Sequence, residues 1–466
     1  MRKKSLPLRI NKAAINCVSV HANFLWRYDN GYKQVFRCSL FSIGRYSDSE
    51  GIMAIQRDTK WNVILWGFFF LFYYYNWSSC FLFLPMWLTR MVGLDKTHIG
   101  MVFSSFAVAA ICLQPLLGWV TDKLGPKKYL LWLIVILMVL FAPFFIYVYT
   151  PLLQSHFAIG LVAGGLYLGF IFHAGYGAVE AFVEKVSRNR GFEYGRPRLF
   201  GCFGSAACAT ISGILYGFDP TWIYWIGSAL ALLLVVILLV ARSEPLPGIE
   251  AEQVRQQKVS VLELFKLRRF WYFTLYVLGV ACIYDVFDQQ FINFFTRFFD
   301  HQEQAARAFG YITTAGNLGD AAVMFFIPLL INKYIGSKNA LLITGTIMTI
   351  RIVGSSFATG PIEVLFLRML HNFEVPFLLI GIFKYIADVF DTRLSGTIYL
   401  VGVMFIKQSA AIVLSTVAGH LYDTIGFHSA YLILGSITAA FTLLSAFLLT
   451  STPRQKTADA RTPATL

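Results

Sequence analysis

Charged residues are scarce in this chain, because only 14% of its 466 residues are Asp, Glu, Lys or Arg. The seven cysteines are scattered and odd in number, so they suggest neither a disulfide framework nor a metal-ligand spacing and read as small core residues. The first 60 residues lack an uninterrupted apolar run, so they do not read as a secretory signal. The fold class therefore has to be inferred mainly from the apolar residues.

Apolar residues make up 57% of the chain and aromatic residues 17%, and the apolar runs exceed the roughly 18 residues that a membrane-spanning helix needs. The sequence therefore predicts an all-α polytopic membrane protein with twelve transmembrane helices. The predicted spans are 61–89, 97–121, 129–149, 157–184, 198–217, 221–241, 270–296, 306–332, 339–358, 361–386, 395–422 and 427–449.

Basic residues gather in alternate loops between these spans, which the positive-inside bias places in the cytoplasm, and both termini are then expected inside the cell. They are Lys123, Lys127, Lys128, Lys185, Arg188, Arg190, Arg196, Arg242, Arg255, Lys258, Lys266, Arg268, Arg269, Lys333 and Lys338. The net charge is +14, but residues 1–60 hold eleven Lys and Arg against four Asp and Glu, which is half of that excess. The membrane body is only mildly basic, so nucleic acid is not an expected partner.

The longest hydrophilic connection divides the predicted spans into six and six. Residues 61–241 are expected to form an N-terminal six-helix bundle and residues 270–449 a pseudo-symmetric C-terminal one, joined by a flexible cytoplasmic linker at 242–269. Residues 1–60 are expected to be a basic tail that is disordered or not native, with Met53 as a candidate start; the alternative is a basic arm attracted to anionic lipid. Residues 450–466 are expected to be a cytoplasmic tail.

A glycine and charge pattern stands between the second and third predicted spans. Gly118, Asp122, Lys123 and Gly125, followed by Pro-Lys-Lys, match the loop signature of the major facilitator superfamily. Glycine permits a tight turn, and Asp122 near a helix end can pair with basic groups and hold two helices in one of a transporter's states. A weaker copy recurs at 332–339, where a duplicated six-helix unit would place it; the alternative is two unrelated basic turns.

Arg368, His371 and Glu374 stand three residues apart in an otherwise apolar stretch, residues 361–386, that is long enough to cross a bilayer. Three residues advance about 4.5 Å along a helix and turn back by roughly 60°, so these side chains form a slanted stripe on one face. Since a charge at membrane depth costs roughly 2.5 to 3.5 kcal/mol, the stripe must face a protein interior or a watery cavity, which indicates transport. Apolar neighbours favour the neutral form of Glu374, which can then carry a proton until a nearby Arg favours its release, and Arg351 is the candidate.

A second charged set lies in the fourth and fifth predicted spans. Glu180 and Arg198 offer the acceptors and bidentate donors that neighbouring sugar hydroxyls need, so we expect a substrate site there. The aromatic run that contains Tyr74 and Trp77 more often serves packing than sugar binding, but these two residues share one face.

The seventh predicted span carries two carboxylates, Asp285 and Asp288, three residues apart and therefore on one face. Lys407, Arg368 and Arg351 are the intramembrane cations that can neutralise them. A structural charge pair is the expected role of the two carboxylates, with proton handling as the alternative.

The motifs taken together closely resemble the lactose permease-like oligosaccharide:proton symporters of the major facilitator superfamily, over about residues 60 to 452. The matching motifs are Pro85-Met-Trp-Leu, Asp122-Lys-Leu-Gly, Ala-Val-Glu180-Ala-Phe, Glu184-Lys-Val-Ser-Arg188, Phe192-Glu-Tyr-Gly-Arg196, Tyr284-Asp-Val-Phe-Asp288-Gln-Gln, Phe309-Gly-Tyr-Ile-Thr-Thr, Leu370-His-Asn-Phe-Glu374-Val-Pro and Phe383-Lys-Tyr.

The resemblance implies a role for each candidate residue. It implies that Glu180 and Arg198 hold galactosyl hydroxyls, helped by His371 of the other bundle, and that Asp285 pairs with Lys407 and Asp288 with Arg368. The implied substrate-binding set is Glu180, Arg198, Cys202, Ser205, Asn317, Asp320, His371 and Lys407. The implied proton-translocation set is Glu374, Arg351, His371 and Tyr284.

Several positions depart from the pattern of the family's type member. Ser205 replaces a Trp that stacks on the galactose ring, Asn317 replaces a carboxylate, and Asp320 replaces an amide one helical turn later, where it could act in place of that carboxylate. Arg368 stands where the type member has Lys, which keeps the charge and changes its geometry. These changes affect the preferred sugar more than the mechanism.

The sequence is interpreted as a sugar:proton symporter of a bacterial inner membrane, a multi-pass protein that works by alternating access of two bundles around a midplane site. Galactosides such as lactose or melibiose are expected substrates, with raffinose or sucrose as competitors. A proton-coupled drug exporter of the same fold and a transport-inactive sugar sensor are the alternatives. We expect no enzymatic activity, cofactor or metal; the expected partners are sugar, protons and the lipid bilayer, and the expected state is a monomer.

Overall fold

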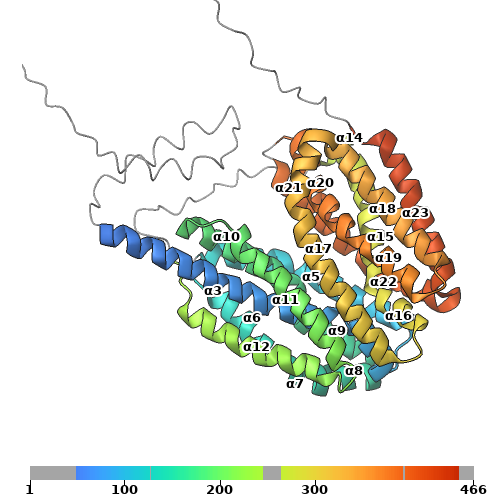
Figure 1. The fold of residues 1–466 in the computed structure, drawn as a ribbon, viewed down its shortest axis with the longest axis horizontal. Coiled ribbons are helices and arrows are strands. Elements are labelled where there is room, and N and C mark those ends of the chain that lie inside the picture. Colours follow the sequence, from blue (N-terminus) through green and yellow to red (C-terminus); the bar gives the residue numbers. More distant parts are fainter. Residues whose placement is uncertain (1–48, 126, 245–263, 392–393, 451–466) are drawn as a thin grey trace, which may run out of the picture. The chain divides into compact units, whose positions relative to one another are not determined.

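The computed structural model describes residues 49–125, 127–244, 264–391 and 394–450, which are almost entirely helical (Figure 1). The chain divides between Arg57 and Asp58 into two units. The expectations for the tail up to residue 48, for residues 245–263 of the linker and for the tail after residue 450 lie outside the described residues.

The first six predicted spans correspond to a run of helices in which some spans consist of several segments. In chain order these are α3 (Ser49–Phe81), α4 (Leu84–Trp87), η2 (Leu88–Val92), α5 (Lys96–Leu124), α6 (Tyr129–Val139), α7 (Phe141–Pro143), η3 (Phe144–Tyr149), α8 (Thr150–Ser155), α9 (Phe157–Leu168), η4 (Gly169–Ala174), α10 (Gly175–Arg190), α11 (Gly195–Leu215) and α12 (Thr221–Val240). The fourth span runs to Arg190, past its predicted end at 184, because basic residues suit the last turn of α10 and the helix stops only at Gly191, whose φ is 68°.

The last six predicted spans form the second run, coloured yellow to red in Figure 1. Its helices are α14 (Arg268–Tyr276), η5 (Val277–Ala281), α15 (Cys282–Gln289), α16 (Phe291–Phe295), η6 (Thr296–Phe298), α17 (Gln302–Leu330), η7 (Ile331–Ile335), α18 (Ser337–Phe357), α19 (Pro361–Met369), α20 (His371–Val389), α21 (Ser395–Tyr399), η9 (Leu400–Phe405), α22 (Ile406–Thr424) and α23 (Gly426–Leu448).

Among the described residues, nine helices are long and apolar enough to cross a membrane, and the pair Tyr129–Val139 and Phe141–Ser155, bent by 53°, adds a tenth. Pro143 explains the bend, because it cannot donate to the carbonyl of Val139 and its ring clashes there. The helices α3 and α17 are more polar, since α3 carries Asn62, Asn76 and three consecutive tyrosines, and α17 carries Asn317 and Asp320. With these two helices, the ten spans make up the twelve-helix architecture that the sequence predicts.

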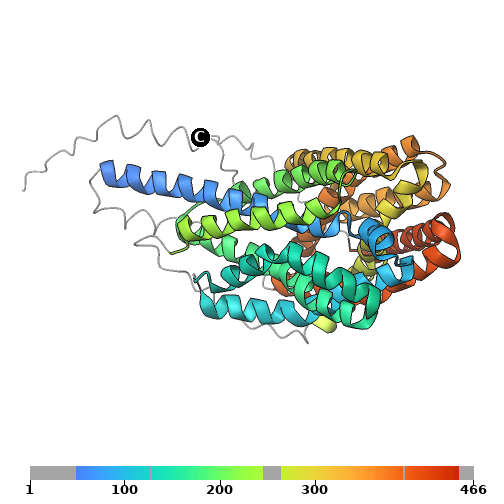
Figure 2. The ribbon, with the colours of Figure 1, turned by 90° about the horizontal axis from the view of Figure 1, so that it is seen from below.

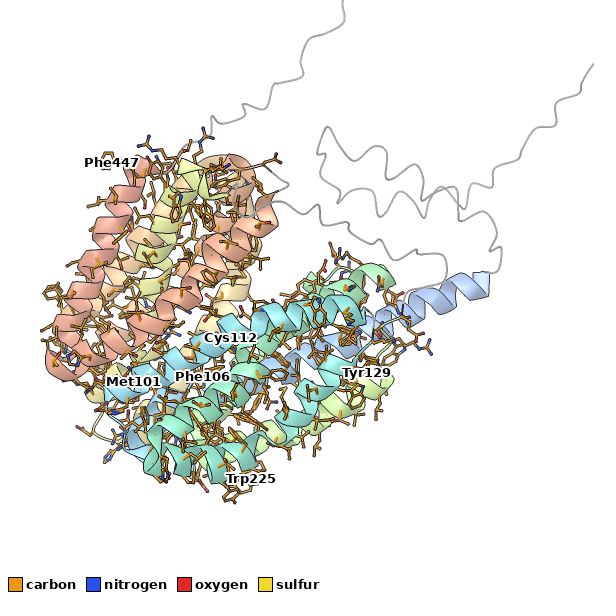
Figure 3. The ribbon with its side chains drawn as sticks, turned by 180° about the vertical axis from the view of Figure 1, so that it is seen from behind. Met101, Phe106, Cys112, Tyr129, Trp225 and Phe447 are labelled. Atoms are coloured by element: carbon orange, nitrogen blue, oxygen red, sulfur yellow. The ribbon has the colours of Figure 1, made fainter. Side chains whose placement is uncertain are left out.

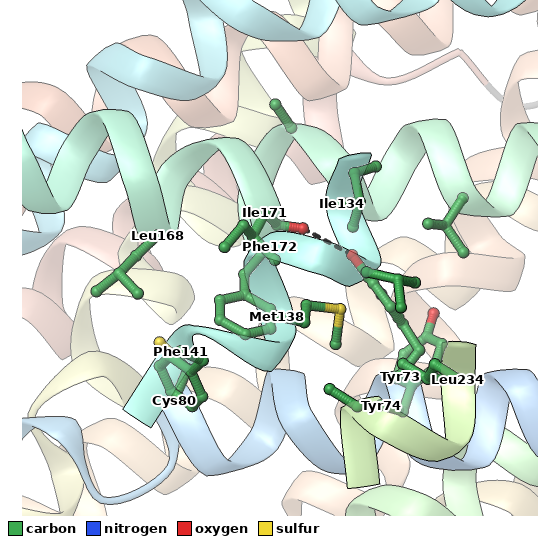
Figure 4. Packing of buried hydrophobic residues seen from close by; sticks show 14 of the residues in the cluster. Tyr73, Tyr74, Cys80, Ile134, Met138, Phe141, Leu168, Ile171, Phe172 and Leu234 are labelled. Carbon is green, nitrogen blue, oxygen red and sulfur yellow. Dashed lines mark hydrogen bonds between the residues drawn. The ribbon is translucent and has the colours of Figure 1, made fainter. Parts of the chain in front are cut away.

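An aromatic core holds the first bundle together. Figure 4 shows Phe141, Phe172 and Met138 packed between helices, and Tyr73 of α3 donates a hydrogen bond of 2.9 Å to the carbonyl of Ile171. Ile171 belongs to the π-helical segment η4, and a π-helical turn breaks the regular helical ladder and can free a carbonyl for such a side chain. The bond ties the first span to the middle of the fourth.

Large apolar side chains cover the outside of both bundles, as Figure 3 shows for Tyr129, Trp225 and Phe447. Phe447 is 86% exposed, which suits a surface that faces lipid rather than water. Cys112 is exposed, so the prediction that the cysteines are core residues is wrong for Cys112, whereas Cys80, Cys208 and Cys282 are buried.

Two pairs of helices make the most extensive contacts between the bundles. α5 meets α22, where Asp423 accepts hydrogen bonds from the backbone and side chains of Lys96 and Thr97, at 2.6 to 3.2 Å. α11 meets α17, where Thr314 shares a 2.7 Å hydrogen bond with Thr210. The contact of Asp423 lies at the start of α5, and Figure 2 shows the ribbon of both bundles from a second direction.

The loop signature forms a helix end followed by a turn. Gly125, with φ 61°, ends α5 and forms the tight turn. Gly118 lies inside the helix, so the prediction of a turn at a glycine is confirmed for Gly125 and wrong for Gly118. The ammonium of Lys123 lies 4.8 Å from the Trp119 ring centroid. The side chain of Asp122 lies outside what the structure describes, so its predicted pairing stays a prediction. In the second copy, Gly336, with φ 82°, ends η7 in the same manner.

Candidate functional site

The predicted substrate residues Glu180 and Arg198 meet between α10 and α11. Arg198 Nε donates to Glu180 Oε1 at 2.6 Å, and the Tyr74 hydroxyl of α3 donates to the same oxygen at 2.5 Å. The Arg198 guanidinium also lies 4.2 Å from the Tyr74 ring centroid. About a quarter of each of the two charged side chains stays exposed, 26% for Glu180 and 28% for Arg198, so polar edges remain free for a ligand.

Two tyrosines that sequence reasoning missed surround this pair. Tyr176 of α10 packs edge-on against Tyr74 at 5.8 Å and interacts with Arg198, while Tyr194 interacts with both Glu180 and Arg198. Tyr176 stands four residues before Glu180, a spacing that puts both on one helical face and was a usable signal. Trp77 of α3, half-buried, lies 6.5 Å from Tyr176 by ring centroids, so aromatic rings line this side of the site.

Cys202 and Ser205 lie on α11, about one and two turns beyond Arg198, and both are half-buried. The carbonyl of Ala206 accepts a hydrogen bond from Thr314 of α17 at 2.9 Å. Asn317 follows Thr314 by three residues, so the α11–α17 contact brings the segments of Ser205 and Asn317 to the same interface. A hydroxyl and an amide therefore stand where the type member of the resembled family has Trp and a carboxylate.

The second bundle contains a network of ion pairs centred on Arg351 of α18. Arg351 Nη1 donates to Glu374 Oε2 at 2.6 Å, and Nη2 donates to Asp288 Oδ1 at 2.5 Å. The side chains of Arg351 and Glu374 have no exposed surface. A buried ion pair persists only with good geometry and further hydrogen bonds, because both charges lose water. Sequence reasoning predicted Arg351 beside Glu374 and listed it as a cation for the carboxylates of the seventh span, but did not predict that it would bridge both.

Arg368 and His371 take separate positions in this network. The helix tightens at Leu370, whose N–H bonds to the Leu367 carbonyl three residues back, so the predicted stripe runs across the junction of α19 and α20. Arg368 contacts Asp288 at 2.9 Å rather than Glu374. His371 Nδ1 lies 3.1 Å from the Tyr284 hydroxyl and 3.6 Å from Glu374 Oε2, so it connects α20 with α15.

Asp285 and Lys407 form the remaining ion pair, at 3.0 Å between α15 and α22, and both are partly exposed. Lys407 also interacts electrostatically with Tyr176, and Tyr399 of α21 interacts with Tyr176 and Glu180. These interactions cross from one bundle to the other. The Glu180–Arg198 pair therefore lies on the side of the first bundle that is directed toward the charges of the second bundle.

Asp320 lies on α17 near this network without an ion pair of its own among the described residues. It interacts electrostatically with Arg368, Arg351, Asp288 and Glu374. Its Oδ1 atom is buried and has no hydrogen-bond partner. In the part of the chain that the structure describes, no group of His, Cys, Asp and Glu residues has the arrangement of a metal site.

Two helical bundles that enclose paired charges at membrane depth define a membrane transporter of the major facilitator type. The nucleoside transporter NupG, a solved structure, superposes with a TM-score of 0.71 at 17% identity, covering 84% of this chain and all of that chain. This likeness concerns the fold.

The sequence comparisons give the family. A model described as the LacY proton/sugar symporter matches residues 54–462, and the chain belongs to that family. It is 53% identical to a melibiose permease of Enterobacter cloacae over 411 residues, which cover 87% of this chain and 96% of the relative. It is 52% identical to a raffinose permease and 34% to a sucrose permease of Escherichia coli, each aligned over 85% of this chain and 95% of the relative. The protein is a transporter, not an enzyme, and it couples sugar import to protons.

Proposed function

We propose that the protein imports a galactoside or a related oligosaccharide with a proton, by alternating access around the shared space between the bundles. The observation that carries the proposal is the enclosed Arg351–Glu374 pair at 2.6 Å, placed in the bundle that faces the Glu180–Arg198 pair. A sugar site and a protonatable carboxylate on opposite sides of one space are what coupling between sugar and proton requires.

We assign sugar binding to two sides of that space. Glu180 and Arg198 supply a carboxylate and a guanidinium for adjacent hydroxyls, and Tyr74 and Tyr176 hold these charges and offer aromatic surface. The remaining members of the proposed sugar site are Cys202, Ser205, Asn317, Asp320, His371 and Lys407.

We assign the proton to Glu374. When sugar and proton are bound, Glu374 is neutral and its bond to Arg351 weakens; after the sugar leaves, Arg351 favours the carboxylate form and the proton departs. His371 and Tyr284, linked at 3.1 Å, connect this event to the sugar side of the network. The pairs Asp285–Lys407 and Asp288–Arg368 neutralise the remaining carboxylates.

We propose that the structure represents the state in which the site opens toward the cytoplasm. The bonds of Asp423 to Lys96 and Thr97 close the end at which α5 begins, and the basic loops mark the opposite end as cytoplasmic by the positive-inside bias. Both termini then lie in the cytoplasm. The protein would work as a monomer in the lipid bilayer of a bacterial inner membrane.

The proton gradient supplies enough free energy for accumulation. A membrane potential contributes about 2.3 kcal/mol per 100 mV for each transferred charge, and each pH unit adds about 1.4 kcal/mol. Melibiose and raffinose are the first sugars to test, because relatives at 53% and 52% identity carry the names melibiose permease and raffinose permease.

External pH tests the proposal directly. Cells that express the protein, suspended anaerobically in weak buffer, receive melibiose, raffinose, lactose and sucrose one at a time, and cells with the empty vector serve as the control. Transient alkalinisation with at least one sugar is the expected result. If none of the four sugars changes the pH although the protein is present in the membrane, the proposed substrates are wrong.

A further inference from the structure

The central charges of the second bundle do not balance. Its carboxylates are Asp285, Asp288, Asp320 and Glu374, and its permanent cations are Arg351, Arg368 and Lys407. Each of the three cations donates to a carboxylate other than Asp320. Among the described residues, one carboxylate of this cluster, Asp320, therefore has no cation of its own.

The surroundings of Asp320 explain how the protein tolerates this excess. Its Oδ1 atom is buried without a hydrogen-bond partner, and a buried carboxylate anion with an empty acceptor site is costly. A protonated carboxyl avoids that cost, because it carries no charge and has an O–H to donate.

A partner for such an O–H lies on the facing helix. Asn372 of α20 packs directly on α17: a Cβ added to Gly316 would lie 3.2 Å from its Oδ1, and one added to Gly319 would lie 2.6 Å from its Nδ2. Gly316 and Asp320 share one face of α17, four residues apart. The Oδ1 atom of Asn372 is itself buried without a partner. Each of these two oxygens accepts a hydrogen bond only from a donor, and a protonated Asp320 carboxyl or a ligand hydroxyl can supply one.

We propose that Asp320 is a second protonated group, separate from Glu374, which donates a hydrogen bond, to Asn372 in the free protein and to a sugar hydroxyl in the complex. Asp320 then determines sugar specificity as a neutral donor and does not replace the carboxylate that the family's type member has at position 317. This inference rests on the proposed sugar site, of which Asp320 is a member.

The other charged groups around Asp320 are engaged elsewhere. From α19 and α18, Arg368 and Arg351 bond to Asp288 and Glu374, and from α20, His371 lies against Tyr284 of α15. On the helices packed against either end of α17, Arg198 bonds to Glu180 and Arg297 lies over the Phe427 ring. Ionisation of Asp320 would therefore require these contacts to rearrange.

Infrared spectroscopy tests the protonation without any transport assay. Purified protein with Glu374→Gln, which removes the carboxyl of Glu374, should show the C=O stretch of a neutral carboxylic acid at neutral pH. The E374Q/D320N variant should lack that band. Identical carboxylic-acid absorption in the two variants would overturn the proposal.

Asn372→Leu provides the second spectroscopic variant. Removal of the amide oxygen should move the C=O band of the acid toward the higher frequency of a free carboxyl, whereas an unchanged band would rule out Asn372 as the partner. The infrared measurement on Asn372→Leu also tests the protonation of Asp320 if the E374Q/D320N protein does not fold.

The pH dependence of melibiose binding tests the role toward sugar. In E374Q the affinity should still fall at least tenfold as the pH rises from neutral to alkaline, because Asp320 loses its proton, and in E374Q/D320N this fall should disappear. A pH-independent affinity of E374Q would contradict the role of Asp320 as donor. If melibiose does not bind to E374Q at any pH, melibiose is not the substrate, and the infrared measurement still tests the protonation of Asp320.

Discussion

Arg351 and Glu374 form an ion pair with no exposed side-chain surface, and the same guanidinium holds Asp288 through its second terminal nitrogen. Protonation of Glu374 therefore does not leave Arg351 alone, because Asp288 continues to neutralise it. A single buried pair would lose several kcal/mol when one partner became neutral. The bridge over two carboxylates lowers this cost and allows Glu374 to change its protonation state in a buried position.

Replacement of Arg198 by Lys should reduce sugar affinity about 30-fold or more, which corresponds to about 2 kcal/mol. Lys keeps the positive charge but loses the planar donors toward Glu180 and the stacking on Tyr74, which lies 4.2 Å away. Binding of melibiose to the purified variant measures the effect. Arg196→Lys is the matched control, two residues earlier on the same helix and 70% exposed, and its affinity should stay within about 0.5 kcal/mol of the wild type.

Replacement of Asp285 by Asn should be severe, because it leaves the ammonium of Lys407 without its partner at 3.0 Å. Loss of one member of a buried pair costs about 3 to 5 kcal/mol, somewhat less here because both groups are partly exposed. The double variant D285N/K407M should recover folded protein and part of the transport rate. Equal defects in the single and double variants would show that the charge pair is not the reason for the loss.

The ion pairs of the second bundle could be predicted in part from the sequence, because an unpaired charge in a membrane is costly. Because Asp285, Asp288 and Glu374 stand within apolar spans, each needed a cation, and Lys407, Arg368 and Arg351 were the available ones. Which cation meets which carboxylate depends on helix packing, and the sequence did not predict that Arg351 would bridge two carboxylates. The pairing of Asp285 with Lys407 followed from resemblance to a known family and not from spacing.

Other parts of the site left little trace in the sequence. Tyr194 looks like an ordinary membrane aromatic until the fold places it beside Arg198, and Tyr176 is marked only by its position four residues before Glu180. The contact of Asp423 with Lys96 joins residues 327 positions apart, and no local pattern indicates such a partner. Helix positions were easier to predict, because the length of an apolar run is enough to identify most of the spans. The more polar helices α3 and α17 were identified with the help of the spans before and after them.

Asp423→Ala should loosen the joint between α5 and α22, since Asp423 accepts from the backbone and side chains of both Lys96 and Thr97. We expect a shift toward the state that opens at this end, seen as faster labelling of a cysteine introduced at Ser205 by a membrane-impermeant reagent from outside. Asp95→Ala is the control, because Asp95 caps its own helix through His98. Equal labelling rates in D423A and D95A would count against a gating role for this contact.

Lys128→Ala should lower the stability of the first bundle by about 1 to 2 kcal/mol. The ammonium of Lys128 donates to the carbonyls of Leu238 at 2.6 Å and Ala241 at 2.7 Å, where the end of α12 leaves carbonyls unpaired. Thermal unfolding of the purified variant measures the loss. Lys127→Ala removes an exposed neighbouring charge and should have little effect; a similar loss in both variants would exclude the capping contact as the cause.

Replacement of Glu374 by Ala tests the central claim most directly, in one measurement that compares uphill accumulation of labelled sugar with its exchange across the membrane of the same vesicles. If Glu374 carries the coupled proton, the variant should lose accumulation and sugar-dependent alkalinisation but keep exchange, because exchange needs no release of the proton. Accumulation at the wild-type level in the Glu374→Ala variant would contradict this account.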